Sequence, residues 1–208
     1  MKDVMTATIS ALRDTVLSRR SIRSFGREPV PEEIVRDLLA DALWAPSPHN
    51  SQPCRFTVLS DSRDKERLAA AMAGRLADEL RGDRVPAGHI ERQTTRSQER
   101  IVGAPVAIVC SLEGDGLVSY PDQRRTTLEW EMAVQSVGAV LQTLFLLAHE
   151  RGIGSCWMAA PMYCPDIVRQ TLSLPDSYAP QALALLGYPA GSGKIRPRRS
   201  LDAVVDFR

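Results

Sequence analysis

Histidine and cysteine, the usual ligands of metal sites, are scarce in this sequence. The 208 residues include three histidines and four cysteines. They form no C-x-x-C pair and never stand at ligand spacing, whereas a zinc site needs several such residues close together. We therefore expect no metal site, and we interpret the cysteines as reduced thiols of the core.

Net charge is lacking too, because 26 basic and 25 acidic residues give a formal charge of +1. This balance gives no reason to expect nucleic acid or a membrane as a partner.

Residues 1–17 lack the compact apolar stretch of a secretory signal, so a cytoplasmic location is expected. No repeat or low-complexity tract divides the chain. Residues 1–208 are therefore predicted to form a single domain.

Unbroken apolar runs of the length that crosses a membrane, about 18 residues or more, are absent. The longest helix-compatible stretch, residues 127–151, is interrupted by polar pairs at 135–136 and 142–143. It is predicted to be a central helix whose broad apolar face begins at Trp130 and packs on the core.

A second, narrow apolar stripe on this predicted helix consists of Met132, Ala139 and Leu146, which recur every seven residues. A helix that is apolar on two sides must be covered on both. The stripe therefore packs either on a second core layer or on another subunit, and wheel geometry favours neither.

Around this helix, apolar periodicity predicts further helices and four or five short strands in one sheet, a mixed helix-and-strand fold. The helices are predicted at residues 5–18, 30–44, 64–80, 89–103 and 166–172. The strands are predicted at residues 54–60, 104–111, 154–161, 181–188 and 203–207. The strand at 104–111 is continuously apolar, which indicates burial on both faces.

A dense basic segment, RRSIR, follows the first predicted helix. It places Arg19, Arg20, Ser21 and Arg23 within five residues. Guanidinium and hydroxyl groups together suit the several acceptor oxygens of a phosphate. This pattern predicts an anion site, and a solvated basic turn is the alternative.

Residues 45–53, APSPHNSQP, combine three prolines with five polar side chains. Polar groups on a proline-stiffened loop are typical of a binding segment, although a plain surface connector has the same composition.

Two further basic stretches are ambiguous. Residues 89–103 carry arginines at 92, 96 and 100, which indicates a solvated helix face or a lid over an anionic substrate. The tail at 187–200 contains Gly-Ser-Gly-Lys, but Tyr188 replaces the first glycine of a nucleoside-triphosphate loop and Ile195 replaces its Ser or Thr. We reject that motif.

Taken in order, these segments make nearly the whole chain resemble the nitroreductase family of flavin enzymes. They are RRSIR, APSPHNSQP, the long helix followed by G-x-G-S, and G-Y-P with a basic tail. Within the family, the chain is most similar to the flavin-binding C-terminal domain of the coenzyme F420 γ-glutamyl ligase, through segments such as Tyr120-Pro121-Asp122. The resemblance implies an α+β homodimer, with a central mixed sheet flanked by helices and two FMN molecules at the subunit interface.

The resemblance also implies the residues of the flavin site. Arg19, Arg20 and Ser21 would hold the FMN phosphate and ribityl chain, and Arg23 would face the flavin N1/O2 edge. The second subunit would contribute Pro46, Ser47, His49, Asn50 and Gln52. Gly154 and Ser155 would approach N5, and Arg196 and Arg198, with Arg199 as an alternative, would reach the phosphate.

FMN would itself carry a hydride from NAD(P)H to a small-molecule electron acceptor such as a quinone or nitro compound, so no catalytic side chain is required. Arg23 would stabilise the negative charge that reduction leaves near N1/O2.

Three other functions stay open. One is reduction of a dehydro precursor in coenzyme F420 biosynthesis, whose phosphate and carboxylate groups would meet the arginines at 92, 96 and 100. Another is storage or sensing of FMN without turnover. The last is a cysteine hydrolase built on Cys156 with His49 or His149.

Overall fold

The computed structural model describes residues 11–208. The first predicted helix is seen only at residues 11–18, and its earlier part lies outside the described residues. The elements that follow are α2 (Glu32–Ala42), η1 (Pro48–Asn50), β1 (Cys54–Leu59), α3 (Ser62–Gly82), α4 (Ala87–Val102), β2 (Val106–Glu113), α5 (Gln123–Glu150), β3 (Gly154–Met158), η2 (Ala160–Tyr163), α6 (Pro165–Leu172), β4 (Tyr178–Gly187) and η3 (Leu201–Ala203).

The four strands form one sheet in the order β1-β2-β4-β3, and each neighbouring pair is antiparallel. The expectation of a mixed sheet is therefore wrong for these strands. Among the described residues, parallel pairing occurs only in the isolated bridge between Ser21 and Ser155.

The closing strand predicted at 203–207 is also wrong. Leu201–Ala203 is a short 3-10 turn, and the residues after it are irregular and exposed. Apolar alternation alone does not make a strand when no neighbouring strand supplies hydrogen bonds.

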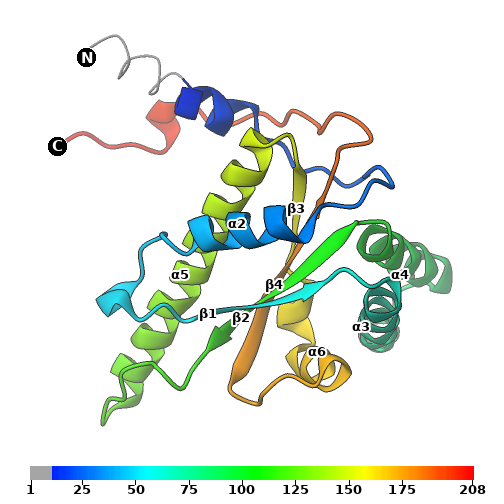
Figure 1. Cartoon of the computed structure of the whole chain (residues 1–208). Helices are drawn as coiled ribbons and strands as arrows, with labels where there is room; N and C mark the ends of the chain where they lie inside the picture. Colours follow the sequence, from blue (N-terminus) through cyan, green and yellow to red (C-terminus); the bar gives the residue numbers. More distant parts are fainter. Residues whose placement is uncertain (1–10) are drawn as a thin grey trace.

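Helices cover both faces of the sheet (Figure 1). α2 and α5 lie on one face, and α3, α4 and α6 lie on the other. Side chains of β2 alternate between the two cores, with Ile108 and Cys110 facing α5 and with Ala107 and Val109 facing α3. The predicted burial of this strand on both faces is confirmed, and it results from helices on both sides rather than from parallel pairing.

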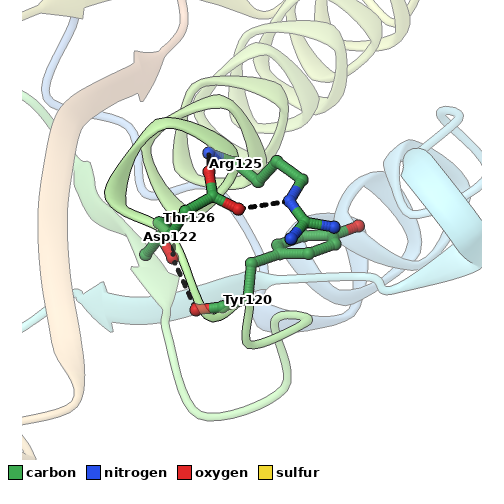
Figure 2. A network of polar contacts seen from close by, with 4 residues as sticks. All are labelled: Tyr120, Asp122, Arg125 and Thr126. Carbon is green, nitrogen blue, oxygen red and sulfur yellow. Dashed lines mark hydrogen bonds and ion pairs between the residues drawn. The ribbon is translucent and has the colours of Figure 1, made fainter.

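The central helix α5 begins four residues before its predicted start because Asp122 caps it. The Asp122 carboxylate accepts a hydrogen bond from the Arg125 backbone N–H at 2.9 Å and pairs with the Arg125 side chain. Figure 2 shows this cap, in which the Arg125 guanidinium lies 5.0 Å from the centre of the Tyr120 ring. Thr126 Oγ1 donates to the Tyr120 carbonyl at 3.4 Å. The Tyr120-Pro121-Asp122 segment thus has a structural role at a helix terminus.

The broad apolar face of α5 packs on the sheet as predicted, with Leu141 and Leu144 fully buried. Trp130 is an exception, since it is 39% exposed and lies over Gly114 beyond the sheet. By length and composition α5 could also cross a membrane, but its packing is that of a core helix. The narrow stripe of Met132, Ala139 and Leu146 is only half-buried.

Candidate functional site

A cleft of about 1090 Å³ lies between the segment after the first helix, the C-terminal tail and α4. Basic side chains dominate its lining. They are Arg19, Arg20, Arg23, Arg96, Arg100, Lys194, Arg196 and Arg198. In the described lining, Glu99 is the only carboxylate. Cations from the two ends of the polypeptide therefore converge on one site.

Among the described residues, these cations have backbone carbonyls rather than carboxylates as partners: Arg20, for example, donates to the Leu17 and Arg19 carbonyls at 2.6 and 2.8 Å. On α3, Arg67 and Arg75 pair with aspartates at 3.0 and 2.6 Å. Within residues 11–208, none of the eight basic side chains of the cleft forms an ion pair. Burial, followed by the charges of Arg198 and Arg20, lowers the pKa of Arg19. Like charges held together without counterions destabilise the fold and are typical of an anion-binding site.

The segment 19–25 reaches the cleft by lying along the edge of the sheet beside β3. The Ile22 N–H donates to the Ser155 carbonyl at 2.8 Å, beside the Ser21–Ser155 bridge. A Cβ atom at Gly154 would lie 2.9 Å from the Ile22 Cβ, so glycine is needed for this contact. Gly154 and Ser155 are buried beneath the segment and do not line the cleft themselves.

The C-terminal tail reaches the same cleft through contacts with the N-terminal segment. The Gly26 N–H donates to the Tyr188 carbonyl at 2.8 Å, and the Ala190 N–H donates to the Ser24 carbonyl at 3.0 Å. Further along, a Cβ atom at Gly193 would lie only 2.3 Å from the Arg20 Cβ. The Gly-Ser-Gly-Lys stretch is thus not a nucleoside-triphosphate loop but the point where the tail packs on Arg20.

The loop that contains Pro46, Ser47, His49, Asn50 and Gln52 does not line this cleft. It is nevertheless a defined structure, because Ser47 Oγ accepts a hydrogen bond from the Gln52 N–H at 3.0 Å. His49, Asn50 and Gln52 have positive φ values of 54°, 53° and 47°. Such backbone strain in non-glycine residues costs of order 1–3 kcal/mol each and clusters at functional sites. The strained side chains are exposed.

The structure also shows which of the basic residues line the cleft. Lys194 lines the cleft, although sequence reasoning did not select it. Its position in the tail between Gly193 and Arg196 was the available signal. Arg199 is not in the lining, which leaves Arg196 and Arg198 as the tail arginines of the cleft. Arg96 and Arg100 line it as well, but Arg92, one turn earlier on α4, is exposed outside it.

A cysteine hydrolase is disfavoured by the surroundings of Cys156. This thiol is buried, and burial raises its pKa, although Arg23 and Arg100 act in the opposite direction. His149 Nε2 lies 2.8 Å from Ser18 Oγ. The nearby charges of Arg19 and Arg20 add to burial in lowering the histidine's pKa. A catalytic thiol needs a depressed pKa and an oriented base.

Comparison with known proteins defines the class to which this fold and cleft belong. The model of the nitroreductase family matches residues 16–188. The NADH dehydrogenase of Thermus thermophilus is 30% identical over 230 residues, covering 98% of this chain and all of the relative. The chain therefore belongs to the nitroreductase family, and the predicted class of enzyme, an oxidoreductase of this family, is confirmed.

Solved structures agree with this assignment. A protein of Desulfovibrio desulfuricans assigned as a nitroreductase, solved in complex with FMN, is 26% identical with a TM-score of 0.74 and covers 95% of this chain and 96% of its own. The FMN-dependent nitroreductase NfnB of Mycobacterium smegmatis, in complex with NADPH, is 22% identical with a TM-score of 0.75. It covers 97% of this chain and 99% of its own, and at this identity it supports the fold alone.

Proposed function

We propose that the protein transfers a hydride from NADH or NADPH, through FMN, to a small conjugated acceptor such as a quinone or a nitro compound. FMN is the cofactor and NAD(P)H the electron donor. One observation carries the proposal: cations from both ends of the chain, which form no ion pair within residues 11–208, meet in one cleft of a nitroreductase-family fold. The named relatives that bind FMN or use NAD(P)H support it.

The residues of the cleft fit the phosphate of FMN. Arg19, Arg20 and Arg198 supply several N–H donors around a partly buried position without an ion pair in residues 11–208. A phosphate dianion offers the matching acceptor oxygens. Ser21 adds a hydroxyl, and Arg196 adds charge from the tail. When bound, FMN supplies the centre that accepts and donates hydride.

Arg23 has a different role in this proposal, because it follows the residues Arg19 and Arg20 that would hold the phosphate. Arg23 is four positions after Arg19, so the two Cα atoms are at most about 14 Å apart. Its side chain, which is exposed in the single chain, would face the N1/O2 edge and stabilise negative charge there. The Ser155 backbone supports the segment that carries it.

The remaining predicted residues belong to the dimer in this proposal. The exposed, pre-shaped loop at 46–52 would reach the flavin of the partner protomer. The half-buried stripe of Met132, Ala139 and Leu146 would pack against its counterpart. Both features supply surface that the single chain leaves uncovered.

A second candidate is reduction of a dehydro precursor of coenzyme F420, for which the cleft offers one specific feature. Such a precursor carries anionic groups, and Arg96 and Arg100 line the cleft. Storage of FMN without turnover is the candidate of another class. Menadione and the dehydro precursor are offered separately to the reduced protein, and the one that re-oxidises the flavin identifies the type of acceptor. If NAD(P)H does not bleach the flavin, the protein stores FMN without turnover.

Two substitutions test the assignment of roles. Arg19→Ala is expected to weaken FMN binding, measured by quenching of flavin fluorescence, by about tenfold or more because a charged hydrogen bond is worth roughly 1.5–3 kcal/mol. Arg23→Ala is expected to slow anaerobic bleaching by NADPH more than it weakens FMN binding. The reverse pattern would reject the roles, and failure of the wild type to bind FMN would reject the function.

A further inference from the structure

Six of the eight cations of the cleft fall into two groups, according to the neighbouring charges that act on Arg19 and Arg100. The first group contains Arg19, Arg20 and Arg198, and the second contains Arg23, Arg96 and Arg100. After burial, the charges of Arg198 and Arg20 lower the pKa of Arg19, whereas those of Arg96 and Arg23 lower the pKa of Arg100. Different neighbouring charges therefore act on Arg19 and on Arg100, and among the cations of the cleft only Arg96 and Arg100 lie on α4. A bound anion would compensate the like charges at each of these two positions in the cleft.

A single mononucleotide phosphate compensates only one of these positions. If it lies with Arg19 and Arg198, the cations on α4 remain without a partner. Arg96 and Arg100 are four residues apart, so they lie one above the other on the same face of α4. Glu99 also lines the cleft but forms no ion pair in the described part of the chain.

We infer that Arg96 and Arg100 bind a carboxylate or phosphate of the second ligand, the one that exchanges electrons with the flavin. Two guanidinium groups on one helix face match the paired oxygens of such an anion. The inference rests on the proposed function, because the first group must hold the FMN phosphate. It adds a specificity that hydride transfer itself does not require: anionic ligands are favoured over neutral ones of the same shape.

Two ligands can bring that anion to the cleft. NADPH carries a 2′-phosphate that NADH lacks, and an acidic acceptor carries its own carboxylate. The test compares wild type with Arg96→Gln/Arg100→Gln in kcat/KM for NADPH against NADH, and for 4-nitrobenzoate against 4-nitrotoluene. Arg92→Gln is the matched control, since Arg92 is on the same helix but exposed outside the cleft.

In the double variant we expect one of the two preferences to fall by about tenfold, with the neutral ligand of that pair affected less than threefold. A fall in the NADPH preference assigns the pair to the 2′-phosphate, and a fall in the nitrobenzoate preference assigns it to the acceptor. If both preferences match those of the Arg92→Gln control, the inference is wrong.

Failure of the proposed function gives a different result. FMN fluorescence quenching is measured on every variant, and the double variant is expected to bind FMN within threefold of wild type. If wild type does not bind FMN, the proposed function fails. Calorimetry of NADPH and of 4-nitrobenzoate with the FMN-free protein then tests the α4 pair alone. Heat from either ligand that the double variant loses supports the inference, and no heat from either ligand in wild type overturns it.

Discussion

Gly193 offers the sharpest test of how the two ends of the chain build the cleft. A Cβ atom at this position would meet the Arg20 Cβ at 2.3 Å and the Arg20 Cγ at 3.1 Å. Ordinary contacts between carbons are about 3.5–4.0 Å long. Because Arg20 Cβ is fixed to the backbone, Gly193→Ala must move the tail and the N-terminal segment apart by roughly 1 Å or more. Gly193 does not have a positive φ, so the added methyl group acts by steric clash alone.

Such a displacement separates Arg196 and Arg198 from the phosphate position that Arg19 and Arg20 define. Loss of one charge-assisted hydrogen bond is worth roughly 1.5–3 kcal/mol, which corresponds to about 10- to 150-fold in the dissociation constant of FMN. Flavin fluorescence quenching measures this constant.

Gly191→Ala is the matched control for this experiment. Gly191 also lines the cleft, but its added Cβ would have no heavy atom within 4 Å. FMN affinity of this variant is therefore expected within twofold of wild type. Equal FMN affinity of the Gly193→Ala and Gly191→Ala variants would show that the tail does not take part in phosphate binding, and would refute the reasoning.

Three further predictions concern stability and assembly. Asp122→Ala is expected to lower Tm by about 2–4 °C at pH 7. Hydrogen bonds from the Arg125 backbone and side chain lower the pKa of Asp122, so its stabilisation is full above about pH 4 and is lost as pH falls through the lowered pKa. A difference in Tm that does not shrink as pH falls below about 4 would contradict this. Lys65→Met removes the donor that lies 2.7 Å from the buried Ala104 carbonyl and 3.1 Å from the partly buried Pro105 carbonyl. This change is expected to lower the free energy of unfolding in urea by about 1–3 kcal/mol, and equal unfolding midpoints would oppose the assignment. Leu146→Glu places a charge on the half-buried stripe, and sedimentation should show a dimer become a folded monomer; an unchanged dimer would place the interface elsewhere.

Periodicity predicted most of the fold because the core follows local rules. The broad face of α5 and the double-sided burial of β2 both depend on the spacing of apolar residues, which the sequence displays directly. Strand direction was not predictable in this way, because a strand covered by helices on both faces is apolar throughout whether its neighbours are parallel or antiparallel.

The convergence of the chain ends followed from the family resemblance rather than from any local pattern. Nothing in the residues near Arg20 indicates that Gly193 will pack on it, since the contact joins positions far apart in the sequence. The Tyr120-Pro121-Asp122 segment shows the opposite case. It suggested a particular relative, but its side chains cap α5 (Figure 2), and a helix cap carries no information about substrate.

Two features of the described residues that depart from local rules belong to the flavin site in our proposal, whereas the positive φ values of Arg84 and Ser173 lie outside the cleft. Three residues of the loop at 46–52 hold positive φ values, and the arginines of the cleft stand together without counterions in the described residues. Each arrangement raises the free energy of the folded chain, although hydrogen bonds such as Gln52 N–H to Ser47 Oγ and Arg20 to the Leu17 carbonyl are present. Such a rise in the free energy of the single chain is expected where binding of an anion or of a second protomer lowers the free energy of the complex. In our proposal the strain at 46–52 is explained by a second protomer, and the like charge of the cleft is explained by a bound phosphate.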